Sequence, residues 1–490
     1  KYDKTIKFES IEDANNFPFV QKLFYLPFVK VVDAEMLAFS QGVTRRGSYA
    51  AYLDISHPEI EEFLDVRKPT GGDVNRKSTN LHHGVMIGDD FMQLIEKATR
   101  EPGFDDSWDL IDPHSGKIVK TIPAKTLWVK LIQNRVETGE PYIVFRDTVD
   151  EALPEFQQKL GLKVHQSNLC SEITLPTNRD RTAVCCLSSV NLEEFDEWKD
   201  DNMFIPDLIR MLDNVLQYFI DKAPVQLGKA VWSAKQERSI GLGAMGFHAY
   251  LQRHNIAFEG VMAKSKNMQM FRRIKKEAVR ATRELAKERG DCPDGMGFGV
   301  RNSHLLAIAP NASSSIIMGN TSPSVEPFRA NAYRQDTLSG SHTNKNKFLQ
   351  KLLEKKAKEH KLNLDEEWSS IIANDGSVQH LKYLTDLEKD VYKTSMEMNQ
   401  QWIINHASER QKYIDQAQSI NLFFRPDADI KYLHAVHFLA WKTGLKTLYY
   451  CRSEKIGKAD KISKRIQREI IKELDISAIA DGDVCLACEG

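Results

Sequence analysis

The sequence has few cysteines, almost no net charge and no long hydrophobic run. Seven cysteines in 490 residues, an odd number, argue against a disulfide-stabilised secreted fold and favour a reducing compartment. A formal net charge of −1 offers no electrostatic basis for binding nucleic acid. No apolar segment is long enough to cross a bilayer, and no signal-peptide pattern opens the chain. We therefore expect a cytoplasmic protein with neither a membrane nor a nucleic-acid partner.

Hydrophobic residues make up 41% of the chain and charged residues 28%, as in ordinary globular proteins. Alternating strand and helix patterns favour an α/β fold. One amphipathic helix is expected to begin near Pro206, and a second is expected over residues 271–285, ended by Gly290. The apolar stripe expected on the first helix comprises Leu208, Leu212, Val215 and Phe219.

Residues 241–246 (GLGAMG) match the glycine pattern of dinucleotide-binding proteins. That pattern requires a buried strand immediately upstream, whereas residues 233–239 are polar and charged. We therefore expect a tight glycine turn that leads into a helix from Phe247, with no role in binding nicotinamide.

The stretch at residues 165–176 lies between two runs, 142–145 and 183–185, that have the pattern of buried strands. It is therefore expected to be extended, with residues two apart on one face at a spacing of about 6.6 Å. Such a face would present an amide, a thiol and a carboxylate to one small polar ligand. A lone cysteine in an apolar strand is more often an inert core residue. The residues on this face are Asn168, Cys170 and Glu172.

The order of residue types in this stretch is more specific than the spacing of its polar residues. Residues 167–173 (SNLCSEI) resemble the active-site finger of the large, catalytic subunit of class I ribonucleotide reductases. Three further blocks of that family follow in order: residues 309–314 (APNASS), residues 447–450 (TLYY) and a paired-cysteine tail. The resemblance covers roughly residues 29–490. It implies a ten-stranded α/β barrel, incomplete on its N-terminal side, with a central finger loop.

The resemblance also assigns roles at the finger. Cys170 would become a thiyl radical that takes the 3′ hydrogen of a ribonucleoside diphosphate, which eases loss of the neighbouring hydroxyl. Glu172 would act as general base, while Asn168 and Ser167 would contact the substrate. Cys185 would supply one thiol of the reducing pair, and its neighbour Cys186 is expected to be structural.

Small and hydroxyl-bearing residues follow the apolar run 305–309, a composition that suits either an anion cradle or an ordinary helix cap. The resemblance places the substrate's diphosphate there. The residues concerned are Pro310, Asn311, Ala312, Ser313 and Ser314.

Tyr449 and Tyr450 close another apolar run. Adjacent tyrosines are usually packing residues, but in class I reductases this sequence motif marks the relay that carries an oxidising equivalent to the thiol. The pair disfavours the adenosylcobalamin-dependent class. Together with the absence of a glycyl-radical motif, it also disfavours the anaerobic class.

Two mobile elements are expected from the resemblance. Arg45, Arg46 and Gly47 would form a loop between an effector nucleotide and the substrate base, although the composition alone fits a solvated basic loop. Cys485 and Cys488 would form a redox-active tail that passes electrons to the buried pair by thiol–disulfide exchange. A single CxxC pair without further ligands disfavours a zinc site.

Three regions follow: residues 1–28 match nothing in the family, residues 29–475 form the catalytic domain, and residues 476–490 form the tail. We expect no metal or cofactor bound directly. Expected partners are an N-terminal large-subunit polypeptide, a small subunit carrying a metal-generated radical, thioredoxin or glutaredoxin, nucleotide effectors and a second large subunit. The alternatives are a catalytically silent assembly or regulatory subunit of the same fold, and a simple dithiol oxidoreductase.

Overall fold

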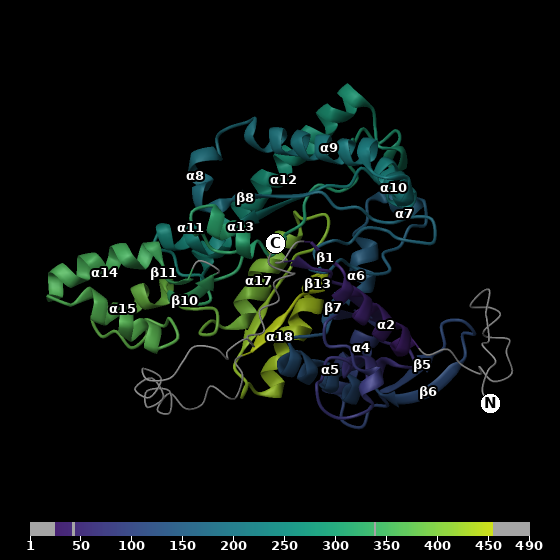
Figure 1. Ribbon diagram of the computed structural model, residues 1–490, viewed down its shortest axis with the longest axis horizontal. Coiled ribbons are helices and arrows are strands. Elements are labelled where there is room, and N and C mark those ends of the chain that lie inside the picture. The colour runs from purple at the N-terminus through teal and green to yellow at the C-terminus, as the bar shows by residue number, and fades with distance from the viewer. Residues whose placement is uncertain (1–24, 42–44, 338–339, 454–490) are drawn as a thin grey trace.

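The computed structural model describes residues 25–41, 45–337 and 340–453 (Figure 1). A row of strands that lie side by side, called the wall below, runs through its centre. Its first part holds the parallel strands β3 (Ala50–Asp54), β4 (His82–Ile87) and β7 (Tyr142–Phe145). Strand β13 (Thr447–Leu448) then pairs with β7 in the antiparallel sense. Every residue of β4 and β7 is buried, which confirms the predicted buried strand at 142–145.

The wall continues through parallel neighbours. Strand β14 (Cys451–Ser453) pairs with β12 (Leu422–Phe424), and single bridges join Ile308 to Gln418 and Leu242 to Leu306. Strand β9 (Gly241–Met245) then pairs with β8 (Leu187–Asn191). Eight segments of the described chain therefore lie side by side, in two parallel groups that meet where β7 contacts β13. This arrangement confirms the expected α/β fold.

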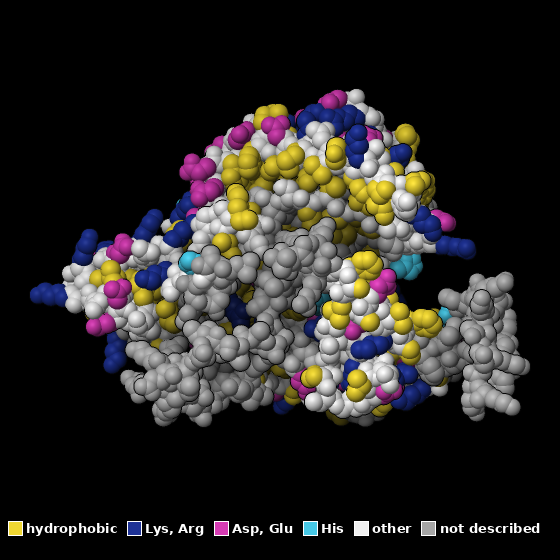
Figure 2. Space-filling model, viewed as in Figure 1, with side chains coloured by type: hydrophobic (Ala, Val, Ile, Leu, Met, Phe, Trp, Pro, Cys, Tyr) yellow, Lys and Arg dark blue, Asp and Glu magenta, His cyan; other side chains and the backbone are white. Residues whose placement is uncertain are grey.

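Helices α9 (Phe204–Lys222) and α12 (Val261–Arg289) pack together beside β8 and β9 (Figure 1). The predicted stripe on α9 is rotated from the real one, because Val215 is 49% exposed. Hydrophobic side chains gather on the surface where α9 and α12 lie (Figure 2). The apolar residues of α9 that face the core are Ile205, Ile209, Leu212, Leu216 and Ile220.

The second predicted helix is confirmed, since α12 buries its expected stripe and ends at Gly290, which adopts a φ of 85°. The predicted glycine turn is wrong for residues 241–245, which form the buried strand β9. A Cβ on Gly243 would lie 2.7 Å from the carbonyl oxygen of Ala307, so this glycine permits close strand packing. Only Gly246, with a φ of 84°, makes a turn, and α11 (Phe247–Arg253) follows as expected.

A separate small core lies at one side of the molecule (Figure 1). It is built from α14 (Lys347–His360) and α15 (Leu364–Ala373) beside the hairpin of β10 (Ala332–Thr337) and β11 (Gly340–Lys345). Within the described residues, no helix is long and apolar enough to span a membrane.

The other strands are short antiparallel pairs, and the other helices cover the wall or connect its strands. The strands are β1 (Ser40–Gln41), β2 (Arg45–Arg46), β5 (Ser107–Ile111) and β6 (Ile118–Pro123). The longer helices are α2 (Tyr25–Ala38), α4 (Asp89–Arg100), α5 (Ala124–Thr138), α10 (Gly228–Glu237), α17 (Gln400–Gln411) and α18 (Ile430–Lys442). The shorter helices are α3 (Ile60–Leu64), α6 (Arg146–Glu151), α7 (Glu155–Lys159), α8 (Phe195–Trp198), α13 (Ala312–Ile317) and α16 (Asp386–Val391).

Candidate active site

The finger stretch forms a turn, so the predicted extended backbone is wrong. Leu169 and Cys170 occupy the turn, and Ser171 adopts a φ of 64°, in the left-handed region. The Ser171 N–H donates to the Asn168 carbonyl at 3.3 Å, and the Asn168 side-chain oxygen accepts from the N–H of Ile173 at 3.2 Å. The loop therefore closes on itself, with the amide, the thiol and the carboxylate within five consecutive residues.

Side chains from separate parts of the wall hold this turn. The Tyr52 hydroxyl, on β3, donates to the Asn168 carbonyl at 2.6 Å. The Ser419 hydroxyl donates to the Cys170 carbonyl at 2.6 Å and lies 3.3 Å from Oε2 of Glu172. These contacts bring the Glu172 carboxylate, which is buried, back toward the backbone of Cys170. Cys170 as a residue is half-buried, so it is not fully enclosed in the core.

Cys170 packs against a cluster of aromatic rings formed by Tyr142, Tyr449 and Tyr450. The ring centroids of Tyr449 and Tyr450 are 4.2 Å apart, and those of Tyr142 and Tyr449 are 4.8 Å apart. Tyr449 and Tyr450 come from the junction between β13 and β14, nearly 280 residues after the finger by number (449 minus 170). The fold therefore joins two of the predicted motifs around one sulfur atom.

A buried polar group that the sequence did not suggest lies behind Tyr450. The Tyr450 hydroxyl is 3.3 Å from Nδ1 of His82, and that nitrogen is 2.5 Å from Oε1 of Glu140. The second oxygen of Glu140 accepts from the backbone N–H of His83 at 2.9 Å and contacts its imidazole at 3.0 Å. Burial would raise the pKa of Glu140, but the charges of His82 and Arg67 and these hydrogen bonds hold it well below its usual range. The histidine pair at the start of β4 was the available sequence signal.

Cys185 belongs to a group of packed side chains that is separate from the tyrosine cluster. The predicted buried strand at 183–185 is wrong, because these residues have irregular backbone and are half-buried. Cys185 packs beside Ile173 and Leu175, in the segment that follows the finger turn. Burial raises the pKa of the Cys185 thiol well above its ordinary value, and the negative charge of Glu172 raises it further. Cys185 is therefore a thiol next to the finger and held in its protonated form.

The expected phosphate segment begins a short helix at the wall. Pro310 and Asn311 precede α13, and Asn311 occupies the N-cap position with a φ of 55° but makes no side-chain capping hydrogen bond. The Ser189 hydroxyl, on β8, donates to the Asn311 side-chain oxygen at 3.1 Å. Residues 310–314 are all half-buried, so the segment is neither enclosed in the core nor fully exposed to solvent.

Comparison with known proteins decides the family. The family model described as the ribonucleotide reductase barrel domain matches residues 23–295 and 294–451, nearly all of the described chain. The chain belongs to the class I ribonucleotide reductase large subunits. It is 50% identical over 484 residues to the ribonucleoside-diphosphate reductase large subunit of Invertebrate iridescent virus 3, with 89% of this chain and 76% of that protein covered.

Two further comparisons agree with this assignment. The putative large subunit of Frog virus 3 is 52% identical over 431 residues, with 87% of this chain and 74% of that protein covered. Among solved structures, the class Id ribonucleotide reductase alpha subunit of Actinobacillus ureae matches with a TM-score of 0.75 and 39% identity. That match covers 87% of this chain and 74% of the alpha subunit. The fold of this ribonucleotide reductase chain is therefore that of the family's α/β barrel.

Two predicted site residues of this reductase chain lie outside the described residues, and two more are described by their backbone alone. Cys485 and Cys488 lie outside the described residues. The backbone of Arg45 and Arg46 forms β2, which pairs with β1, but their side chains are not described. Gly47 is half-buried, and its N–H donates to the carbonyl of Phe39 at 2.6 Å. Within the described part of the chain, no cluster of three or more His, Cys, Asp or Glu side chains is suited to a metal ion.

Proposed function

We propose that this chain is the catalytic part of a ribonucleoside-diphosphate reductase, an oxidoreductase that removes the 2′-hydroxyl of ribonucleoside diphosphates. One observation carries the proposal: the half-buried Cys170 shares a turn with Asn168 and Glu172 while it packs against Tyr449 and Tyr450. The arrangement supplies a hydrogen-abstracting sulfur, a base and a path for oxidation in one place.

The 2′-hydroxyl is a poor leaving group on an unactivated carbon, so the reaction begins at the neighbouring carbon. In our proposal an oxidising equivalent passes through Tyr450 and Tyr449 and leaves Cys170 as a thiyl radical. The sulfur then takes the hydrogen atom from C3′, which forms the S–H bond and leaves a radical on C3′. Because S–H and C–H bonds of this kind are similar in strength, the transfer is reversible.

Glu172 acts as general base on the 3′-hydroxyl, and its removal of that proton favours departure of the 2′-hydroxyl, which takes a proton from a thiol of the reducing pair and leaves as water. Asn168 and Ser167 contact the sugar hydroxyls. The buried position of Glu172 strengthens its electrostatic action on the substrate, because screening by water is weak there. The half-buried segment of Pro310, Asn311, Ala312, Ser313 and Ser314 binds the diphosphate.

Replacement of the hydroxyl by hydrogen requires two electrons. Cys185 supplies one sulfur of the reducing pair, and a second cysteine of the large subunit supplies the other. Their oxidation to a disulfide provides the electrons. The tail cysteines Cys485 and Cys488 reduce that disulfide by exchange and are themselves reduced by thioredoxin or glutaredoxin.

The remaining partners follow from the same proposal. A radical-bearing small subunit delivers the oxidising equivalent to Tyr450. Nucleotide effectors act through the loop at Arg45, Arg46 and Gly47, and two large subunits associate.

The direct test is Cys170→Ser in the holoenzyme formed by the large and small subunits. Reduction of ribonucleoside diphosphates should fall by a factor of about a thousand or more, because a serine O–H bond is too strong for the transfer. Substrate binding, measured by calorimetry, should be retained. Cys186→Ser is the matched control and should remain active, because Cys186, the half-buried residue after Cys185, has no proposed role in the reaction. Full activity in the Cys170→Ser protein would contradict the proposal and favour a dithiol oxidoreductase.

A further inference from the structure

Tyr450 is buried together with the two side chains that lie behind its hydroxyl. Tyr450 is 6% exposed, His82 is 4% exposed, and Glu140 is fully buried. A tyrosine that has lost an electron does not keep its phenolic proton, because the oxidised phenol is a strong acid. Tyr450 is almost entirely shielded from bulk water, so a proton that leaves it in the proposed relay needs an acceptor inside the protein.

A positive charge lies against the ring of Tyr450. The guanidinium carbon of Arg452 is 4.3 Å from the centroid of that ring. A cation in this position is attracted to the electron-rich face of a neutral ring. The same cation repels the positive charge that the ring would carry if an electron left and the proton stayed. The electron and the proton of Tyr450 are therefore expected to leave together.

Two side chains in a row provide a path for this proton. The hydroxyl of Tyr450 lies 3.3 Å from Nδ1 of His82, and the same nitrogen lies 2.5 Å from Oε1 of Glu140. An ionised carboxyl group has no proton to donate, so the short contact places a proton of His82 between Nδ1 and Oε1. A proton from Tyr450 can then bind Nδ1 as the first proton moves on to Glu140.

The surroundings of Glu140 keep it available as an acceptor. Its Oε2 accepts from the backbone N–H of His83 at 2.9 Å, and Nε of Arg67 lies 3.7 Å from its Oε1. Burial opposes ionisation, but the charges of His82 and Arg67 and the hydrogen bonds hold the pKa of Glu140 well below its usual range. The carboxyl is therefore ionised at neutral pH. An oxidised phenol is a far stronger acid than a carboxylic acid, so it can still protonate this group.

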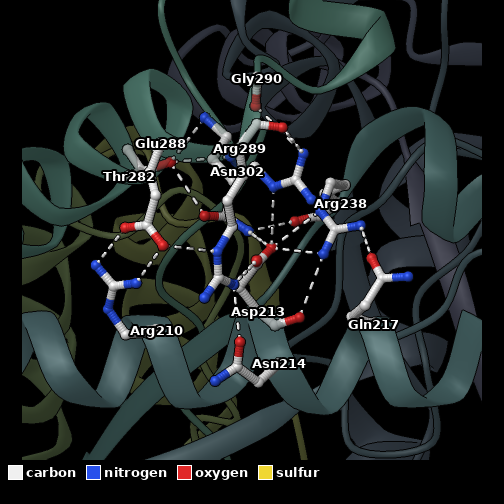
Figure 3. A network of polar contacts seen from close by, with 11 residues as sticks. Arg210, Asp213, Asn214, Gln217, Arg238, Thr282, Glu288, Arg289, Gly290 and Asn302 are labelled. Atoms are coloured by element: carbon white, nitrogen blue, oxygen red, sulfur yellow. Dashed lines mark hydrogen bonds and ion pairs between the residues drawn. The ribbon is translucent and has the colours of Figure 1, made fainter.

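The partners of Glu140 differ from those of a buried carboxylate that only supports the fold. Asp213, on α9, is fully buried and accepts from the guanidinium groups of Arg238 and Arg289 and from the amide of Asn302 (Figure 3). A guanidinium group stays protonated in proteins, and an amide does not act as an acid at neutral pH. Imidazole gains and loses protons near neutral pH. Glu140 is therefore placed for proton transfer, whereas Asp213 is placed for support.

We propose that His82 and Glu140 accept the phenolic proton of Tyr450 during radical transfer. This inference rests on the proposed function. An electron passes from Tyr450 to the oxidised group of the small subunit, the phenolic proton moves to Nδ1 of His82, and the proton of that nitrogen moves to Glu140. Tyr450 is left as a neutral radical and takes a hydrogen atom from Tyr449, which in turn takes one from Cys170. The reverse sequence at the end of turnover returns the proton to Tyr450.

The first test is His82→Gln in the holoenzyme, with single-turnover deoxynucleotide formation as the readout. The rate should fall by about tenfold or more, because the proton then lacks its carrier. Glu140→Gln, which removes the accepting base, should slow the reaction to a similar extent. The KM for the ribonucleotide should not change in either variant, since the altered groups lie at the relay and not at the finger.

Two controls separate proton transfer from support of the fold. His83→Gln removes an imidazole that contacts Oε2 of Glu140 at 3.0 Å but lies outside the proposed path, and it should keep nearly the unmodified rate. Asp213→Asn removes a buried carboxylate elsewhere and should lower the urea midpoint without slowing the folded enzyme. If His83→Gln is as slow as His82→Gln, the proton path is wrong.

A rescue experiment distinguishes a proton carrier from a packing residue. A fluorinated tyrosine introduced at position 450 ionises at lower pH than tyrosine, and its pKa is measured by absorbance in the same protein. Above that pKa there is no phenolic proton to move, so His82→Gln should no longer slow the fluorinated enzyme, although it should at lower pH. Equal slowing at both pH values would overturn the proposal, as would a full rate for His82→Gln with the natural tyrosine. An unmodified holoenzyme that forms no deoxynucleotide would instead overturn the proposed function.

Discussion

Two regions beside the finger turn, one at Tyr449 and Tyr450 and one at Cys185, are built in opposite ways. On the side of Tyr449 and Tyr450, rings pack at centroid distances of 4 to 5 Å, and the buried Glu140 is fully hydrogen-bonded. On the side of Cys185, the backbone is irregular, and the buried carboxyl of Glu237, the last residue of α10, has only a long ion pair of 3.9 Å with Arg181. A radical relay needs fixed distances, so the difference matches the task proposed for the side of Tyr449 and Tyr450.

The largest expected effect is at the relay. Tyr449→Phe should abolish deoxynucleotide formation, because phenylalanine keeps the packing but cannot form a tyrosyl radical. Tyr142→Phe, in the same ring cluster, should retain most of the activity and serves as the matched control. Both proteins should unfold at nearly the unmodified temperature in calorimetry. Equal loss of activity in the two variants would mean that Tyr449 has no role in the reaction beyond that of its neighbour Tyr142.

A smaller effect is expected on stability at the same side. Glu140→Gln removes the charge that His82, His83 and Arg67 face, which should destabilise the protein by about 3–5 kcal/mol at neutral pH. The pKa of Glu140 is depressed in the folded state, so its stabilisation is present above the unfolded value and is lost as the pH falls. The difference between the urea midpoints of the two proteins should therefore begin to shrink as the pH falls below about 4 and continue to shrink at lower pH. A difference independent of pH would contradict this ionisation.

The opposite pH dependence is expected at Glu237, and it sharpens the comparison. Its folded pKa of about 8 lies above the unfolded value of about 4.3, so the contribution of this group to stability is lost as the pH rises. Relative to Glu237→Gln, the unmodified protein should lose about 1.4 kcal/mol per pH unit between those values. Urea unfolding at a series of pH values would measure this. Parallel curves for the two proteins would show that Glu237 is not buried as described.

The sequence was enough to predict the fold class and the motifs that meet at Cys170, because each motif is a short run of consecutive residues. The conformation of the finger was not predictable. Its left-handed Ser171 depends on Tyr52 and Ser419, more than one hundred residues away in either direction. The strand β9 was missed because its glycines match a turn pattern, and only its close neighbours explain them.

The buried carboxyls were missed for a similar reason. Glu140 and His82 are 58 residues apart in the sequence, and neither is part of a recognisable motif. Glu237 is the last charged residue of an ordinary helix, and only burial distinguishes it from a solvated side chain. Patterns of neighbouring residues do not show which charges the tertiary fold will bury.

The central claim is that the sulfur of Cys170 takes the 3′ hydrogen, and tritium at that position tests it directly. With 3′-tritiated ribonucleoside diphosphate, the unmodified holoenzyme should release some tritium to water, since the thiol formed at Cys170 can exchange its hydrogen with solvent. The Cys170→Ser holoenzyme should release none. Undiminished release from Cys170→Ser would mean that another group removes this hydrogen and would contradict the account.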